Sequence, residues 1–298
     1  MSPRTGTAAR RGKTPALRFG TVGSPKSTPR RPGGSPGGIA RLRELGLDAL
    51  ELAWVQSVRV TDATCAVIRQ AALEHDVAIS VHAPYYINLN AQTAELLEAG
   101  RGRLLAAARC GAKAGATDII FHPASYHQQP PGEVYERVRA QLVELTQTLR
   151  AEGVTVTLRP ELTGKGAMFG SLEEIVQLSR DVPGVRPCID FAHLHARTNG
   201  AYNTYAEFSA ALKTVRRGLG AAGLHDLHIH LSGIRYTPKG EREHLTLGES
   251  DLALAELCHA LHDAGARGRV LCESPAMEDD ALVIQATYRR IARQPAGD

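Results

Sequence analysis

The repeated placement of His, Glu and Asp at the ends of short apolar segments is the strongest constraint on the fold. Six of the eight strands that we expect end in, or run directly into, such a side chain. These side chains are His82, His122, Glu161, Asp190 with the nearby His193, His230, and Glu273. Residues so far apart in the sequence can form one site only if the strand ends meet at one rim, as in a closed barrel of parallel strands.

Apolar runs alternate with amphipathic segments, which is typical of βα units around a parallel sheet. We expect strands at 17–22, 48–53, 77–83, 117–122, 154–160, 186–191, 226–232 and 268–273. We expect helices at 36–45, 62–75, 93–115, 130–152, 171–181, 203–218, 250–264 and 277–293. Eight strands alternating with eight helices predict an α/β protein, a single-domain (β/α)8 TIM barrel with its active site at the carboxyl ends of the strands.

The domain organisation follows from length and composition. A chain of 298 residues, 43% hydrophobic, suits one barrel, because α/β barrels of roughly 250 residues fold as single domains. We expect the barrel at 17–293, a disordered basic tail at 1–16 and a short tail at 294–298. An organelle-targeting peptide is the alternative interpretation of the first tail. We expect no membrane partner, because no apolar run approaches the roughly 20 residues that span a bilayer. Five scattered cysteines indicate reduced core residues and a cytoplasmic setting.

The strand-end carboxylates of Glu161, Asp190 and Glu273 predict a metal centre. Burying a carboxylate without a partner cation is costly, and a divalent metal would supply that cation. A lone His at a strand end is more often a hydrogen-bonded core residue, so the prediction depends on convergence. Either His228 or His230 could serve, and we favour His230 because it lies nearer the carboxyl end of its strand. Nitrogen and oxygen ligands without thiolate favour zinc, with manganese as the second choice.

Motifs at the strand ends resemble those of the endonuclease IV family of apurinic/apyrimidinic endonucleases. The motifs are Val81-His82-Ala83-Pro84-Tyr85-Tyr86-Ile87-Asn88-Leu89, Phe121-His122-Pro123, Pro160-Glu161-Leu162-Thr163-Gly164-Lys165, Cys188-Ile189-Asp190-Phe191-Ala192-His193, His230-Leu231-Ser232-Gly233, His244-Leu245-Thr246-Leu247-Gly248-Glu249 and Leu271-Cys272-Glu273-Ser274-Pro275. The resemblance covers about residues 17–290. It implies a zinc-dependent barrel that cuts DNA on the 5′ side of an abasic site, leaving a 3′-hydroxyl and a 5′-deoxyribose phosphate.

The resemblance also implies a ligand set. The first metal would take His82, His122 and Glu161; the second would share Glu161 and take Asp190, His230 and Glu273; the third would take His193 and His244. This chain departs from the pattern at Arg242, where the family commonly has an Asp ligand. Glu241 or Glu243 could substitute if the loop bends, but in a regular extended segment both would face away from His244. We therefore expect two or three ions, with the third site open.

Two metals about 3.5–4 Å apart can activate the attacking water and stabilise the leaving oxygen of a phosphodiester. Glu161 is the candidate catalytic residue between them, because a bridging carboxylate would fix the position of the nucleophile. Arg242 is the second candidate, because a guanidinium can take part of the charge of the leaving oxygen.

Basic side chains after the strands predict a rim that binds the DNA backbone. They are Lys26, Arg30, Arg31, Arg59, Lys165, Arg197, Arg235, Lys239 and Arg242. An ordinary solvated surface is the alternative, since the net charge is only +4. Tyr85, Tyr86 and Trp54 could stack on a displaced sugar or base, although Trp54 suits the core as well. Tyr85 and Asn88 are the candidates beside a pocket for the extruded abasic nucleotide.

The expected partner is double-stranded DNA with abasic sites, bound by a monomer associated with the nucleoid. The Gly-rich segment 32–38 lacks a P-loop lysine, so we expect no nucleotide cofactor. Two other functions stay open. The strand-end residues Glu161, Asp190, His230 and Glu273 also resemble the single-metal set of sugar isomerases and epimerases on xylose-isomerase-like barrels. A binder of abasic DNA that does not cut it is the other alternative.

Overall fold

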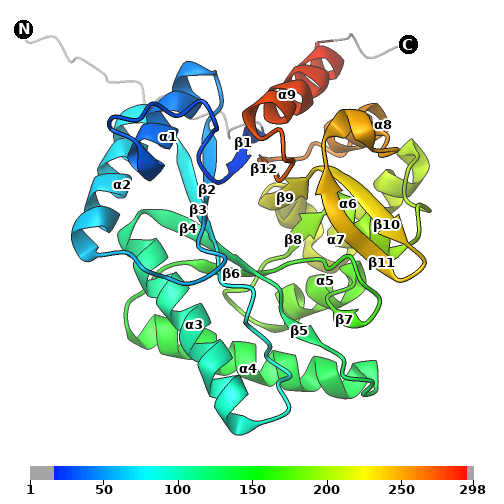
Figure 1. Cartoon of the computed structure of the whole chain (residues 1–298). Helices are drawn as coiled ribbons and strands as arrows, with labels where there is room; N and C mark the ends of the chain where they lie inside the picture. The colour runs from blue at the N-terminus through cyan, green and yellow to red at the C-terminus, as the bar shows by residue number, and fades with distance from the viewer. Residues whose placement is uncertain (1–16, 294–298) are drawn as a thin grey trace, which may run out of the picture.

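The computed structural model describes residues 17–293, and the tails expected at 1–16 and 294–298 lie outside the described residues. One sheet contains eight parallel strands in the order β6-β4-β3-β2-β1-β12-β9-β8. The parallel bridges Leu158–Val185 and Glu161–Cys188 join β6 to the chain at β8 and close the sheet into a barrel (Figure 1). The predicted single-domain (β/α)8 barrel is therefore confirmed. No helix within 17–293 is long and apolar enough to cross a membrane.

The barrel strands overlap all eight expected strands. They are β1 Arg18–Val22, β2 Ala49–Ala53, β3 Ala78–His82, β4 Ala116–Phe121, β6 Thr157–Pro160, β8 Cys188–Asp190, β9 Leu227–Leu231 and β12 Gly268–Cys272. Two antiparallel pairs were not expected from the sequence, β5 Ala124–Ser125 with β7 Met168–Phe169 and the hairpin β10 Gly233–Thr237 with β11 Gly240–Leu245. The hairpin is rich in charged residues and carries no apolar alternation that would have indicated it.

The helices lie outside the barrel and cover its strands (Figure 1). The expected ones are α1 Gly34–Glu44, α2 Asp62–His75, α3 Ala94–Lys113, α4 Pro131–Ala151, α5 Leu172–Asp181, α7 Tyr205–Leu224, α8 Leu254–Asp263 and α9 Glu278–Ala292. The start expected for α8 was too early, because a 3-10 turn at Leu247–Glu249 precedes it. The short helix α6 Phe191–Arg197 was missed. It is buried on nearly every side, so it shows no amphipathic period.

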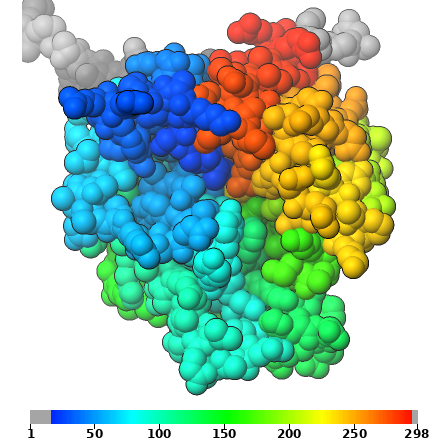
Figure 2. All heavy atoms as spheres, in the orientation of Figure 1, coloured from blue at the N-terminus to red at the C-terminus, as the bar shows by residue number. Residues whose placement is uncertain are grey.

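Local sequence explains where two of the helices begin. Helix α4 has Pro131 at its first position, where the missing N–H costs nothing, and it buries a stripe from Val134 to Leu149. Helix α5 begins with a capping box, in which Ser171 and Glu174 satisfy each other's backbone N–H groups. The first and last barrel strands, β1 and β12, pair side by side, so the blue and red ends of the chain pack together (Figure 2).

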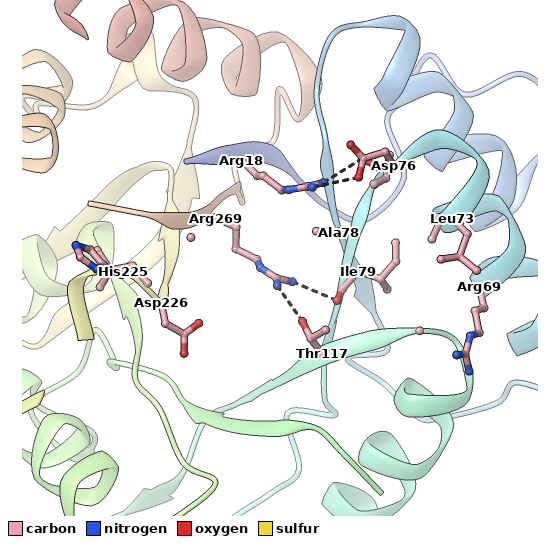
Figure 3. A pocket seen from close by; sticks show the side chains of 15 residues that line it. Arg18, Arg69, Leu73, Asp76, Ala78, Ile79, Thr117, His225, Asp226 and Arg269 are labelled. Carbon is pink, nitrogen blue, oxygen red and sulfur yellow. Dashed lines mark hydrogen bonds and ion pairs between the residues drawn. The ribbon is translucent and has the colours of Figure 1, made fainter. Parts of the chain in front are cut away.

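The amino-terminal end of the barrel holds a buried network of ion pairs. Arg159 on β6 is 2% exposed and donates to Asp118 on β4 and, at 2.7 Å, to Asp226. Asp118 also lies 2.9 Å from Arg269 on β12. A cavity of about 440 Å³ adjoins this network. Two of the three arginines that line it are turned onto protein partners, Arg18 onto Asp76 and Arg269 onto the Thr117 hydroxyl (Figure 3).

The cavity and the network lie at the barrel end where structural roles are usual. Burial alone would raise the pKa of Asp118, but Arg159 and Arg269 hold that pKa well below its ordinary value. The ionised Asp118 therefore stabilises the folded state above the unfolded-state pKa of about 4. This stabilisation is lost as the pH falls through the lower folded-state pKa.

Removing Asp118 should destabilise the protein strongly. Asp118→Ala leaves the buried Arg159 with half of its carboxylate partners, and breaking a buried pair typically costs about 3–5 kcal/mol. Denaturant unfolding at pH 7 measures this loss. Glu136→Ala, which breaks the exposed pair with Arg139 on α4, is the matched control and should barely move the midpoint. Equal midpoints for the two variants would contradict the prediction.

Candidate metal centre

The residues that the sequence placed at strand ends lie together at the carboxyl end of the barrel. His82 ends β3, His122 follows β4, Glu161 follows β6, Asp190 ends β8, His230 lies on β9 and Glu273 follows β12. Three groups of side chains each bring their ligand atoms within 4.8 Å of one another, and each group has a residue in common with another. These groups are His82 with His122 and Glu161, Glu161 with Asp190, His230 and Glu273, and Asp190 with His193 and His244.

Glu161 lies at the middle of these groups and is fully buried. Its Oε2 atom is 3.2 Å from Nε2 of His82 and 3.2 Å from Nε2 of His122. Its Oε1 atom is 3.2 Å from Nδ1 of His230 and 3.3 Å from Nδ1 of His193. The two oxygens of one carboxylate thus face different groups of histidines, which is the arrangement that a carboxylate between two metal ions requires.

Unsatisfied polar atoms indicate that the site suits a cation. Oδ2 of Asp190 is buried and has no hydrogen-bond partner among the described residues. Burial also raises the pKa of Asp190. Nε2 of His193 and Nε2 of His244 face each other at 3.3 Å. Two ring nitrogens at that distance need a proton or a metal between them.

Backbone carbonyls orient three of the histidine rings. The Nδ1 atom of His82 lies 2.9 Å from the carbonyl oxygen of Ala83, and that of His193 lies 2.9 Å from the carbonyl oxygen of Leu162. The Nδ1 atom of His244 lies 3.3 Å from the carbonyl oxygen of Glu273. Because a carbonyl can only accept, each Nδ1 carries the proton and each Nε2 presents its lone pair to the site. Outer acceptors of this kind are typical of metal-ligating histidines.

Glu241 of the hairpin lies beside the third group. In the hairpin, Glu243 pairs with Arg235 and Glu241 pairs with Tyr236, so Arg242 is the extra residue of a β-bulge. A bulge shifts the alternation of side chains by one residue. Glu241 therefore shares the face of His244, and its Oε2 atom lies 3.1 Å from Nε2 of His193. The sequence left Glu241 as a substitute ligand only if the loop bends, and the bulge is the irregularity that brings it to this face.

A glycine makes room for this carboxylate. Gly164, in the loop after β6, lies so close that a Cβ atom there would collide with the Glu241 carboxylate. Its carbonyl oxygen also accepts a hydrogen bond from the Glu241 N–H at 3.0 Å. The loop after β6 and the bulged hairpin thus position Glu241 together.

Protons compensate the buried carboxylates when no metal is bound. Burial disfavours the charged imidazolium, but Glu161 outweighs it and raises the pKa of His82 to about 9. The pKa values of His193 and His230 are raised well above their ordinary range by the surrounding carboxylates. Metal and protons therefore compete for the same nitrogens, and metal affinity should increase with pH.

The sequence interpretation missed Glu51 on β2. This carboxylate is fully buried, and its Oε2 atom accepts from the Ser80 hydroxyl at 2.8 Å and lies 2.8 Å from Nε2 of His228. Burial lowers the pKa of His228 to about 4, so His228 is neutral. His228 faces Glu51, whereas His230 faces Glu161. Glu51 is the single charged residue of β2, which was the available signal, but it does not stand at the strand end.

The predicted basic residues are exposed at the same end, with one exception. The exposed ones are Lys26, Arg30, Arg31, Arg59, Lys165, Arg235, Lys239 and Arg242. Lys165 lies 3.5 Å from Glu241, and Arg235 lies 3.2 Å from Glu243. Arg197 was wrong as a rim residue, because its guanidinium donates to the backbone carbonyls of Thr163, Lys165 and Met168. It holds the loop after β6 in place.

Aromatic side chains lie at the mouth of the site. Tyr85 is 51% exposed, and its ring centre is 5.4 Å from that of His82 and 5.7 Å from that of His122. Burial, with Glu273 and Glu161, raises the pKa of Tyr85 to about 12, so its hydroxyl remains a donor at neutral pH. Tyr86 is exposed, whereas Trp54 packs partly against the core. Asn88 is engaged locally, with its Oδ1 accepting from the Asn90 N–H.

Comparison with known proteins identifies the class to which this fold and site belong. The profile of the xylose isomerase-like TIM barrel family matches residues 39–294. The chain belongs to this family.

Within the family the relatives have different activities. An uncharacterized protein of Methanocaldococcus jannaschii is 36% identical over 92% of this chain and 98% of its own length. A probable endonuclease 4 of Ureaplasma parvum is 25% identical over 61% of this chain and 60% of its own length. The endonuclease IV structure from Thermus thermophilus has a TM-score of 0.70 and 21% identity over 92% of this chain and 98% of that chain. The predicted resemblance to endonuclease IV is confirmed. A D-psicose 3-epimerase structure has a TM-score of 0.65 and 19% identity over 92% of this chain and 100% of that chain.

Glu241→Ala should remove one tightly bound zinc ion per chain, because the third group then keeps too few ligands. Elemental analysis of zinc after dialysis measures the number. Glu243→Ala is the matched control, since Glu243 lies on the same strand, is exposed and faces Arg235. Arg242→Ala should also leave the zinc content unchanged. A full zinc complement in Glu241→Ala, or an equal loss in Glu243→Ala, would contradict the role of the bulge.

Proposed function

We propose that this protein is a metal-dependent endonuclease that cleaves the DNA backbone on the 5′ side of abasic sites, leaving a 3′-hydroxyl and a 5′-deoxyribose phosphate. The observation that carries the proposal is that a pair of histidines lies on each side of the group formed by Glu161, Asp190, His230 and Glu273. His82 and His122 adjoin it through Glu161, and His193 and His244 adjoin it through Asp190. The likeness to the endonuclease IV structure supports the same function.

These extra histidines separate the two reaction classes. The group of Glu161, Asp190, His230 and Glu273 would suffice for a sugar enzyme with one metal ion. Two further sets of ligands have a use in phosphodiester hydrolysis, where charge develops on both the attacking and the leaving oxygen. Zinc fits the nitrogen and oxygen donors, and manganese is the second choice.

The residues of this chain would then have separate roles. Bound divalent ions would lower the pKa of a water molecule and neutralise phosphate charge. Glu161, held between four histidines, would fix the reacting centre as the catalytic carboxylate. Tyr85 presents a protonated hydroxyl at the mouth and can donate to a phosphate oxygen. Arg242 extends from the bulge beside Glu241 and can take charge from the leaving oxygen.

Binding of the duplex would use the exposed rim. The side chains of Lys26, Arg30, Arg31, Arg59, Lys165, Arg235 and Lys239 lie on loops and the hairpin at the metal end of the barrel. They can contact backbone phosphates in any sequence. An abasic nucleotide costs less to extrude than a stacked one, and Tyr85 and Asn88 lie beside the mouth that would receive it.

A sugar epimerase is the second candidate. The four-residue group is complete in itself, and its ligand atoms lie within 4.8 Å of one another. A D-tagatose 3-epimerase-like protein shares the fold with a TM-score of 0.68 and 16% identity, over 93% of this chain and 98% of that chain. The two candidates differ in substrate, so one set of assays separates them.

Incision of a labelled duplex with one stable abasic analogue tests the proposal. We expect cleavage 5′ to the lesion, loss of cleavage after chelation and its return with zinc or manganese. Glu161→Gln should reduce the incision rate by more than roughly 100-fold, because losing even a residue that only hydrogen-bonds to a metal ligand typically costs up to that factor. Glu173→Gln, on the exposed face of α5, is the control of equal charge change. Binding without cutting by the metal-loaded protein would indicate a non-cleaving binder, and epimerisation of a ketohexose without incision would favour the second candidate.

Arg242→Ala should lower kcat for incision by about 10²–10³, the cost of removing one donor to a developing oxyanion. Arg235→Ala, on the partner strand of the hairpin, should instead raise KM and reduce the salt dependence of binding, because under this proposal Arg235 would bind backbone phosphates away from the reacting oxygens. Single-turnover rates at saturating protein separate the two effects. Unchanged kcat in both Arg242→Ala and Arg242→Asp would remove Arg242 from the reaction.

A further inference from the structure

Glu51 stands one layer deeper in the barrel than His82 on the neighbouring strand, and its carboxylate lies within 4.8 Å of the ligand atoms of His82 and Glu273. In the register of β2 and β3, Glu51 pairs with Ser80, while Ala53 two residues later pairs with His82. We propose that Glu51 is a positioning residue that fixes His230 with Nδ1 toward the metal. The proposal rests on the metal centre proposed above and adds a residue that lies outside its ligand set.

Among the described residues, His230 differs from His82, His193 and His244 because no backbone carbonyl lies against its Nδ1 atom. Its Nδ1 atom lies 3.2 Å from Oε1 of Glu161 and 3.6 Å from Oε1 of Glu273, so Nδ1 faces the site. Its Nε2 atom points deeper, 3.0 Å from Oε1 of Glu51. A neutral imidazole carries one proton, so a ring that offers Nδ1 to a metal must be protonated at Nε2.

That buried N–H needs an acceptor, and Glu51 supplies the suitable one. Nε2 of His230 and Oε1 of Glu51 each have no aligned hydrogen-bond partner among residues 17–293, although they are only 3.0 Å apart. The thiol of Cys188 also lies near His230, but sulfur is a weak acceptor.

Glu51 is itself held in place. The Ser80 hydroxyl donates to Oε2 at 2.8 Å, and Nε2 of His228 lies 2.8 Å from the same oxygen. Oε1 is therefore directed at His230. A carboxylate behind a ligating imidazole raises its basicity and fixes its tautomer, and losing such a partner typically costs about 10–100-fold in metal affinity. The backbone carbonyls behind His82, His193 and His244 serve the other rings in the same way.

Zinc affinity of the whole chain, measured by competition with a chromophoric chelator, tests the proposal. We expect Glu51→Ala to weaken one zinc ion by about 10–100-fold, and Glu51→Gln, whose amide oxygen still accepts, to weaken it less. Ser179→Ala is the matched control, because it also removes a buried hydroxyl and its hydrogen bond, on α5, and leaves Glu51 with both of its partners. Circular dichroism checks whether each variant folds. If Glu51→Ala does not fold, the near-isosteric Glu51→Gln still tests the proposal.

The tautomer of His230 gives a second readout that a structural role would not move. Long-range ¹⁵N–¹H spectra of the zinc-loaded protein should show His230 protonated at Nε2 in the wild type, and a shifted signal in Glu51→Gln. Wild-type affinity in both Glu51 variants, an equal loss in Ser179→Ala, or protonation of His230 at Nδ1 would overturn the proposal. Neither measurement uses DNA, so absence of DNA incision would contradict the proposed function and not the role of Glu51. A wild-type protein that binds no zinc would contradict both proposals.

Discussion

Closure of the barrel between β6 and β8 is the constraint on which the candidate site depends. The parallel bridge from Glu161 to Cys188 brings the end of β6 against β8, two residues before Asp190. Without it the carboxylate of Glu161 would lie at an open sheet edge, exposed to water. With it, Glu161 is buried among four histidines that come from β3, β9 and the segments after β4 and β8. Burial of that anion is tolerable only with compensating cations, either protons or metal ions.

The barrel interior separates two uses of buried charge by depth. At the amino-terminal end, Arg159, Asp118 and Arg269 pair with one another, so their charges are compensated within the protein and contribute to stability. At the carboxyl end the carboxylates outnumber fixed cations, because the nearby positive groups are histidines whose charge depends on protons. The layer of Glu51, Ser80 and His228 lies between these ends. The distribution of charge along the barrel axis thus leaves the carboxyl end with carboxylates that either protons or a metal ion must compensate.

The sequence predicted the strands and the convergence of the His, Glu and Asp side chains at their ends, for a physical reason. Parallel barrel strands are buried on both faces, so they appear as short apolar runs, and a single His or Glu at the end of such a run stands out. The features that the sequence did not predict lack that contrast. Helix α6 is buried on nearly all sides, and the hairpin β10–β11 is polar. Glu51 and Arg159 lie within strands, where partners far away in the chain decide whether a charge is compensated.

The bulge at Arg242 shows why matching residues by position can mislead. Counting along the chain places Arg242 where the resemblance to endonuclease IV implies an acidic ligand, which suggests that the third group has lost a carboxylate. The extra residue in β11 shifts the alternation, so that Glu241 enters the place that position alone gives to Arg242. The same shift leaves Arg242 exposed on the rim, where a guanidinium can meet phosphate oxygens. A local change in strand register can therefore preserve an acidic group beside His193 and His244 and add a cation next to it, while the aligned sequence shows only the loss of an acid.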